Sequence, residues 1–349
     1  MEIAAEVRET VDSLAGSRHS GSSELGSTDE KLQDWLASVA PALVPPKKRR
    51  RTMTWKKLKQ HIQLGYGMGH GAAYQPWLTL RRKNASKCSN QVAAYLFTLA
   101  RPGYFFSRGE YQIALLLQWL GLEDFREQYP IWPISHPHPL FGAPGAEGIH
   151  LGHSPGLLRI AQEAGIEHGV YPGTRIPYVA TFDFMLTVRI HGALTLIALS
   201  CKPIDNPNNE IEWRTLERLE LERRYAERNR IKYAVISSRL VPIRMAANLE
   251  WCVDSATLVE TPHLIAIAPL FAAQFVSTPD LSIADAVLRS SDACKLSRHD
   301  GWTVFRHCLW TQAIDLDISK PILTTYPALI GGRRLRQQLK QALIGGGSA

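Results

Sequence analysis

Residues 181–203, TFDFMLTVRIHGALTLIALSCKP, are the stretch that decides the fold. Apolar residues alternate with less apolar ones from Phe182 to Ile190, which is the pattern of a half-buried strand. The run from Ala193 to Leu199 is continuously apolar, as in a more deeply buried strand. His191-Gly192 separates the two runs. The sequence therefore predicts an antiparallel hairpin with a tight turn.

Two reactive residues lie at the same end of this predicted hairpin. Asp183 is near the start of the first strand, and Lys202 is near the end of the second. An acid and a lysine in a buried sheet are costly unless they bind something, and a divalent metal with a phosphate is one candidate. The pattern resembles the skeleton of the PD-(D/E)xK nucleases, in which an earlier helix supplies a further acid.

Glu110 is available as that helix acid. Residues 107–120, SRGEYQIALLLQWL, are predicted to form a helix. Ser107 and Glu110 match a capping box, so one interpretation of Glu110 is a cap alone. Ile113 and Leu117 place it on the buried stripe of the helix, from which a carboxylate could also reach a metal.

A second candidate acid lies in a strongly charged helix. Residues 210–230 carry many charge pairs at helical spacing, typical of a solvated face. Glu222 instead shares a stripe with Leu219 and Ala226, an unusual position for an acid. The run IKYAVISS at 231–238 follows and reads as another buried strand. The order helix, hairpin, helix, strand predicts a mixed α/β sheet with its reactive residues at one edge.

Composition indicates a globular protein with a polyanionic partner. The chain has 349 residues, 45% of them hydrophobic, and a formal net charge of +8. One basic region follows an acidic, polar arm. A solvated linker, an import signal and an engineered addition remain alternatives to DNA binding for this region. The predicted DNA-binding residues in it are Lys47, Lys48, Arg49, Arg50, Arg51, Lys56 and Lys57.

The glycine-rich segment at residues 65–82, GYGMGHGAAYQPWLTLRR, does not predict a nucleotide site. It lacks a following GK[ST] and the GxGxxG spacing. We interpret it as a close approach of the backbone to a partner such as DNA, with His70 as a DNA-binding candidate. The histidines at residues 133–160 include H-x-H and H-x-x-H spacings. No cysteine or obvious carboxylate accompanies them, so an inserted loop is favoured over a zinc site.

Cysteine usage favours a reducing cytoplasm, and hydropathy argues against a membrane protein. The five cysteines are scattered and contain no CxxC, which argues against a disulfide framework. There is no apolar run of about 18 residues, so no membrane span is predicted. The acidic N-terminus is not a signal peptide.

We expect four regions along the chain. Residues 1–52 form a flexible acidic arm ending in the basic block, and residues 53–240 form the catalytic domain. Residues 241–332 form a small helical domain, and residues 333–349 form a basic tail helix with a glycine-rich linker.

Three blocks together carry a more specific resemblance. GYGMGHGAAYQPWLT, EDFREQYP and CKP…RTLERLELERRYAERN resemble the TnsA endonuclease subunit of Tn-seven-like transposons, including the CRISPR-associated ones, over residues 60–255. The family implies a restriction-endonuclease-like domain followed by a winged-helix-like one. It implies Mg²⁺, for which Mn²⁺ is expected to substitute, and cleavage near the 5′ ends of transposon DNA. The implied partners are the DDE transposase TnsB and the AAA+ regulator TnsC, the latter through the C-terminal domain and tail.

The resemblance also assigns roles to individual residues. It implies catalysis by Glu110, Asp183 and Lys202. It implies metal binding by Glu110, Asp183, the Cys201 backbone carbonyl and Glu222. One position departs from the pattern, because Ser200 stands where relatives carry a glutamine, and a hydroxyl is a weaker Mg²⁺ ligand than a carboxylate.

Two other functions stay open at this point. A stand-alone restriction or repair nuclease of the same fold would cut DNA without partners. A catalytically weakened scaffold would only bridge TnsB, TnsC and transposon-end DNA, and Ser200 is the residue that favours it.

Overall fold

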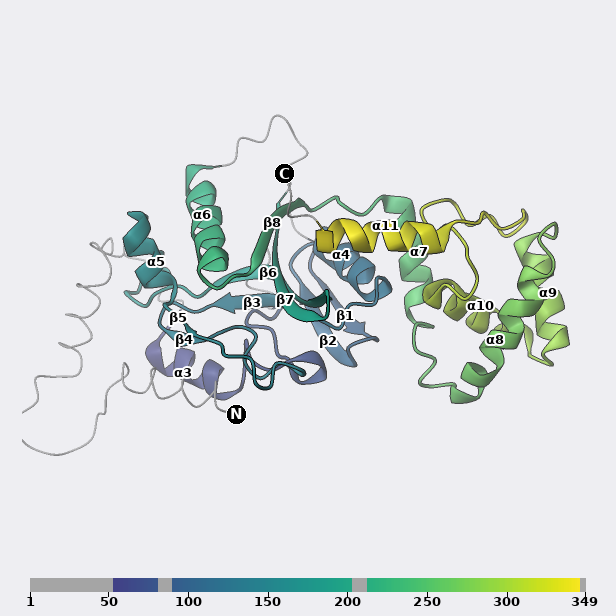
Figure 1. The fold of residues 1–349 in the computed structure, drawn as a ribbon, viewed down its shortest axis with the longest axis horizontal. Helices are drawn as coiled ribbons and strands as arrows, with labels where there is room; N and C mark the ends of the chain where they lie inside the picture. Colours follow the sequence, from purple (N-terminus) through teal and green to yellow (C-terminus); the bar gives the residue numbers. More distant parts are fainter. Residues whose placement is uncertain (1–52, 81–89, 203–211, 346–349) are drawn as a thin grey trace, which may run out of the picture. The chain divides into compact units, whose positions relative to one another are not determined.

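The structure is a computed structural model that describes residues 53–80, 90–202 and 212–345 (Figure 1). The chain divides into two compact units, and each unit is built from two separate segments. The first contains Met1–Asn84 and Asp124–Ile236, and the second contains Ala85–Glu123 and Ser237–Ala349. The acidic arm lies outside the described residues, as do Lys47, Lys48, Arg49, Arg50 and Arg51.

A four-stranded sheet forms the centre of the first unit, in the order β3-β6-β7-β8. The pairs β3–β6 and β6–β7 are antiparallel. Helix α6 connects β7 to its neighbour β8, and such a helical crossover is the connection that parallel strands need. The predicted mixed α/β architecture is confirmed. The strands are β3 (Asp124–Ile131), β6 (Ala180–Ile190), β7 (Ala193–Lys202) and β8 (Lys232–Ser237).

The predicted hairpin is β6–β7. Ile190 pairs with Ala193, so the turn contains only His191 and Gly192. Their φ angles are 49° and 84°. Two positive φ angles in a two-residue turn match the twist of antiparallel strands, and glycine adopts such an angle at little cost. The register therefore starts from the turn and continues to Phe184 opposite Leu199.

Two helices bury apolar side chains of the first unit. They are α5 (Leu157–Ala164) and α6 (Trp213–Arg228). Leu221 and Tyr225 of α6 belong to the same buried cluster as Phe182 of β6 and Ala198 of β7. Burial of these side chains removes apolar surface from water, which is the main force that holds a helix to a sheet. Helix α6 therefore has an apolar face toward the core and a charged face toward solvent.

A second buried cluster lies around α3 (Trp55–Gln63) and the glycine-rich segment that follows it. Leu58 and Ile62 of α3 pack there with Trp77 and Trp132. The two tryptophan rings lie edge to face with their centroids 5.1 Å apart, a preferred aromatic geometry. A one-turn 3-10 helix, η1 (Gly71–Ala73), lies between α3 and Trp77.

The histidine-rich loop is held by hydrogen bonds to the chain itself. It contains the short strands β4 (His136–Pro137) and β5 (His153–Ser154). The Nδ1 atom of His136 lies 2.8 Å from the Ile134 carbonyl, and its Nε2 atom lies 2.8 Å from the Tyr225 hydroxyl. His138 Nε2 lies 2.8 Å from the Asn229 carbonyl. These contacts hold the side chains of His136 and His138 in place.

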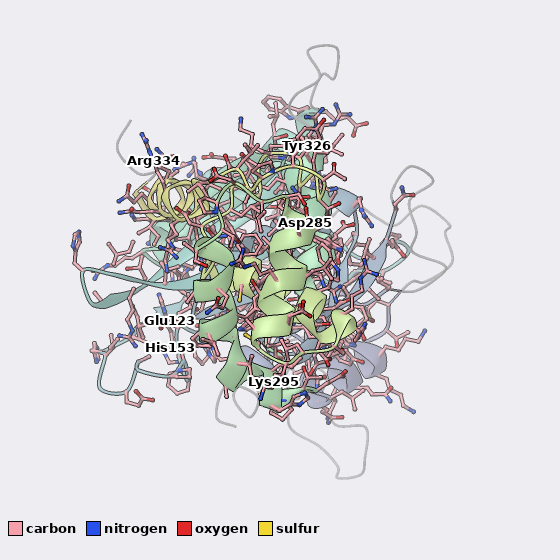
Figure 2. The ribbon with its side chains drawn as sticks, turned by 90° about the vertical axis from the view of Figure 1, so that its right-hand side faces the viewer. Glu123, His153, Asp285, Lys295, Tyr326 and Arg334 are labelled. Atoms are coloured by element: carbon pink, nitrogen blue, oxygen red, sulfur yellow. The ribbon has the colours of Figure 1, made fainter. Side chains whose placement is uncertain are left out.

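The second unit combines a hairpin, a helix and a C-terminal helical bundle. Its elements are β1 (Val92–Leu96), β2 (Arg101–Phe105), α4 (Arg108–Trp119), α7 (Ile243–Val253), α8 (Pro262–Val276), α9 (Ile283–Ala293), α10 (Arg298–Thr311) and α11 (Gly332–Gly345). Figure 2 shows Asp285 near the start of α9 and Lys295 just past its end. An isolated antiparallel bridge joins Leu316 to Ile330. The predicted basic tail helix is α11.

The segment Ala85–Glu123 groups with the C-terminal part of the chain, and the predicted domain boundaries stay predictions. The reason is side-chain contact at long sequence separation. Arg108 of α4 forms an ion pair of 2.6 Å with Glu250 of α7, and the Arg336 guanidinium of α11 lies 5.6 Å from the centre of the Trp119 ring. Within the described residues, no helix is both long enough and apolar enough to span a membrane.

Candidate active site

Asp183 is held by the backbone of the neighbouring strand. Phe184 and Leu199 are the last paired residues at the open end of the hairpin, and Asp183 directly precedes Phe184 in β6. Its Oδ2 atom accepts a hydrogen bond of 2.6 Å from the Cys201 amide. On the other side, β3 pairs with β6 through Glu127 and Tyr129, and Gln128 between them has a φ of 48°. The irregular residue of β3 therefore lies opposite Asp183.

Lys202 reaches the same carboxylate oxygen. Its Nζ atom lies 3.5 Å from Asp183 Oδ2 and 3.2 Å from the Cys201 carbonyl. Burial alone would lower the pKa of Lys202, but the carboxylates of Asp183 and Glu222 outweigh it, and the pKa is raised. The side chain is therefore a permanent cation at neutral pH. The predicted meeting of Asp183 and Lys202 is present in the structure.

Glu222 brings a second carboxylate to this group from α6. Its side chain is buried, with 8% of the residue exposed. Its Oε2 atom accepts hydrogen bonds from the Ser200 hydroxyl at 2.5 Å and from the Tyr233 hydroxyl at 3.0 Å. Burial raises its pKa, and the Ser200 hydrogen bond and the Lys202 charge only partly oppose that rise. Asp183, Lys202 and Glu222 thus form one electrostatically coupled cluster.

Glu110 is in the second unit, at the start of α4. The Ser107 hydroxyl donates to its Oε1 atom at 3.0 Å, and the Phe106 amide donates to its Oε2 atom at 2.9 Å. The Ser107 hydroxyl also accepts from the Glu110 amide at 3.1 Å, so the predicted capping box is present. Glu110 belongs to a different unit from Asp183, Lys202 and Glu222, and its catalytic and metal-binding roles stay predictions.

The remaining DNA-binding candidates lie on α3 and in the glycine-rich segment. Lys56 and Lys57 are exposed on α3. His70 is turned inward, with Nε2 at 3.0 Å from the Phe141 carbonyl and Nδ1 at 3.8 Å from Asp124 Oδ2. DNA contact by these three residues stays a prediction.

The donor atoms of the cluster fit a hard divalent cation. Asp183 and Glu222 offer carboxylate oxygens, and Cys201 offers a backbone carbonyl. No group of three or more His, Cys, Asp or Glu side chains suited to a metal is found among the described residues. Mg²⁺ does not require such a cage, because it is commonly held by one or two carboxylates together with waters and substrate phosphates. A soft metal would find no matching set here.

Sequence reasoning missed the contacts of Ser200 and Tyr233. A lone tyrosine in the strand pattern IKYAVISS carries no functional signal, because aromatic residues are common in strands. In the sequence, Ser200 stands out only as a departure from the family pattern. The hydrogen bonds of Ser200 and Tyr233 to Glu222 form only because β7, α6 and β8 lie together in the fold. Local sequence does not show which distant segments become neighbours.

Comparison with known proteins gives one specific relative. No family model matches the chain. The chain is similar to the transposon Tn7 transposition protein TnsA of Escherichia coli, with 28% identity over 216 residues. The aligned region covers 61% of this chain and 68% of that protein. This similarity confirms the resemblance that the three sequence blocks carry. The chain is a TnsA-like protein.

Proposed function

We propose that this protein is a Mg²⁺-dependent DNA endonuclease that cleaves near the 5′ ends of a transposon during cut-and-paste transposition. It acts together with a DDE transposase of the TnsB type and an AAA+ regulator of the TnsC type. The similarity to a transposition protein supports the process. The arrangement of acid and lysine at the open end of β6–β7 supports the chemistry.

The observation that carries the proposal is the contact between Lys202 and Asp183. The lysine lies 3.5 Å from the carboxylate, on the adjacent strand, and keeps its positive charge. A simple structural ion pair does not need a partly buried sheet edge, where removing both charges from water is costly. A phosphodiester and its metal would make use of both charges.

The proposed roles follow from the charges of the cluster. Asp183, Glu222 and the Cys201 carbonyl would hold Mg²⁺, and Glu110 is the further acid that the resemblance assigns. The chemistry that a bound Mg²⁺ supplies is activation of a water and polarisation of the phosphate. Lys202 would lie against the phosphate and offset the negative charge that grows there as the bond breaks. Asp183 orients Lys202 through Oδ2, the atom that also receives the Cys201 amide.

Several finer assignments belong to the same proposal. The first unit would be restriction-endonuclease-like, and residues 241–332 would be winged-helix-like. The latter region and the tail would bind the regulator. Lys47, Lys48, Arg49, Arg50, Arg51, Lys56, Lys57 and His70 would contact transposon-end DNA. The protein would work in the bacterial cytoplasm, close to the nucleoid.

Strand-specific mapping of donor breaks tests the proposal. The reaction contains a supercoiled donor with both transposon ends, the cognate transposase and regulator, the full chain and Mg²⁺. We expect breaks near the 5′ ends with the wild-type chain and none with Asp183→Ala or Lys202→Ala. Arg159→Ala removes an exposed cation of α5 and is the matched control, which should cut normally.

Each alternative predicts a different pattern of breaks. A stand-alone nuclease would cut the donor when transposase and regulator are omitted. A scaffold would support cutting at the 3′ ends while no 5′-end breaks form, and Lys202→Ala would change nothing. Either pattern would overturn the proposed function.

A further inference from the structure

The carboxylate of Glu222 is fixed by hydroxyl groups from two different strands. Ser200 extends from β7 and Tyr233 from β8, and both donate to Oε2 of Glu222 on α6. The Ser200 bond is 2.5 Å long, as is typical of a hydroxyl that donates to a charged acceptor. Three elements that are far apart in the sequence therefore meet at one oxygen atom.

These bonds leave the two carboxylate oxygens in different situations. An oxygen of a carboxylate has about two acceptor sites, and both of those on Oε2 are occupied. Among the described residues, neither Ser200 nor Tyr233 bonds Oε1. One oxygen is therefore used to orient the group, and the other stays available to a cation.

We call the two hydrogen bonds from Ser200 and Tyr233 to Glu222 the clamp. They affect the orientation of the Glu222 carboxylate more than the packing around it. Ser200 is 1% exposed, so its hydroxyl cannot turn to water instead. The Tyr233 ring packs against Phe182 with centroids 5.9 Å apart, and this contact does not involve the hydroxyl. Removing either hydroxyl would leave the apolar contacts in place.

We propose that Ser200 and Tyr233 are positioning residues that hold Glu222 as a metal ligand, so that α6 supplies the donor that β7 lacks at position 200. The inference rests on the proposed function and deepens it. Ser200 then does not weaken the site by being a poor ligand, because its role is to aim a better one. This reading accounts for a serine in the strand and a buried acid in the helix with one arrangement.

The first test measures how much Mg²⁺ the assembled cleavage reaction requires. Ser200→Ala and Tyr233→Phe should each raise the Mg²⁺ concentration for half-maximal 5′-end cleavage by about 10- to 100-fold, the usual effect of losing a group that orients a metal ligand. Saturating Mg²⁺ should restore most of the rate. Tyr74→Phe is the matched control, because it removes a buried hydroxyl that donates to the Glu127 carbonyl at 2.9 Å in the same unit. Its Mg²⁺ requirement should stay at the wild-type value.

The second test measures metal binding without cleavage. Free Mn²⁺ is counted by electron paramagnetic resonance as it is added to the full chain alone. The dissociation constant should rise with Tyr233→Phe and Ser200→Ala, and Glu222→Gln should raise it as well. In the Glu222→Gln background, the added Tyr233→Phe change should have no further effect, because coupled residues are not additive.

Two results would overturn the clamp. One is a lower maximal rate for Tyr233→Phe with an unchanged Mg²⁺ requirement, which indicates a purely structural role. The other is equal Mn²⁺ binding by the wild-type chain and Glu222→Gln. Failure of the wild-type chain to cut 5′ ends would instead count against the proposed function, and the Mn²⁺ measurement would still decide the clamp.

Discussion

One oxygen atom, Oδ2 of Asp183, receives both the Cys201 amide and the Lys202 ammonium group. The hydrogen bond from the Cys201 amide is 2.6 Å long, and the one from the Lys202 ammonium group is 3.5 Å long. The backbone therefore sets the position of the carboxylate, and the lysine adapts to it. A side chain held in this way has little freedom to lose, which under the proposed function would favour phosphate binding through preorganisation.

His136 predicts how stability responds to acid at the scale of one residue. Burial lowers its pKa from 6.5 to about 4, because the folded chain disfavours the charged ring. The unfolded chain takes up a proton near pH 6.5 and the folded chain only near pH 4. The contribution of His136 to the free energy of unfolding should therefore fall as the pH is lowered through this window, by roughly 3 kcal/mol.

Urea unfolding at pH 7, 6 and 5 measures this fall. His136→Gln should show a shallower dependence on pH than the wild type, whatever its stability at pH 7. His150→Gln changes an exposed histidine of the same loop and should keep the wild-type dependence. An unchanged slope for His136→Gln would contradict the assignment of the buried neutral ring.

At the scale of the element, the geometry of the β6–β7 turn predicts how a substitution at Gly192 changes stability. A methyl group at Gly192 would meet no atom within 4 Å, but φ there is 84°. Gly192→Ala should therefore cost about 1 kcal/mol through backbone strain alone. Gly152→Ala also enters open space, and φ there is not in the left-handed region. That control should leave stability unchanged or raise it slightly.

Denaturant midpoints of the two variants supply the comparison. Equal midpoints for Gly192→Ala and the wild type would show that the turn does not need its left-handed geometry. Because the turn sets the register, any loss should also appear in the amide protection of β6 and β7.

The elements differ in how far the sequence could predict them. The hairpin was predictable because alternation, an apolar run and a turn glycine all lie within 181–203, and the strand-end positions of Asp183 and Lys202 follow from it. The helices α4 and α6 were predictable from periodicity. The hydroxyl contacts of Glu222 were not, because they depend on β8 lying beside β7, and local pattern does not determine which strands become neighbours.

At the scale of the whole molecule, the division into units limits where the chain can be cut. A chain that ends at Ile236 keeps Ala85–Glu123 but loses every later residue of the second unit. Leu116, Leu117 and Trp119 of α4 are buried in the complete chain. We expect the shortened chain to expose apolar surface and to be cleaved rapidly by protease within 85–123.

Limited proteolysis and binding of a hydrophobic dye measure this directly. The full chain should resist cleavage within α4 and bind little dye. A shortened chain with the same protection of α4 as the full chain would show that residues 1–236 are an independent folding unit, as a boundary near residue 240 suggests.

The two-segment construction of the second unit also affects the order of events during synthesis. Synthesis of α4 is complete at Trp119, and about 120 further residues are made before α7 begins at Ile243, which takes roughly 6 to 24 seconds at about 5 to 20 residues per second. During that delay α4 can contact the β1–β2 hairpin but lacks the C-terminal helices of its own unit. The nascent chain therefore exposes apolar surface that a chaperone can bind during this period. A chain that stops prematurely would keep this surface exposed and would be prone to aggregate.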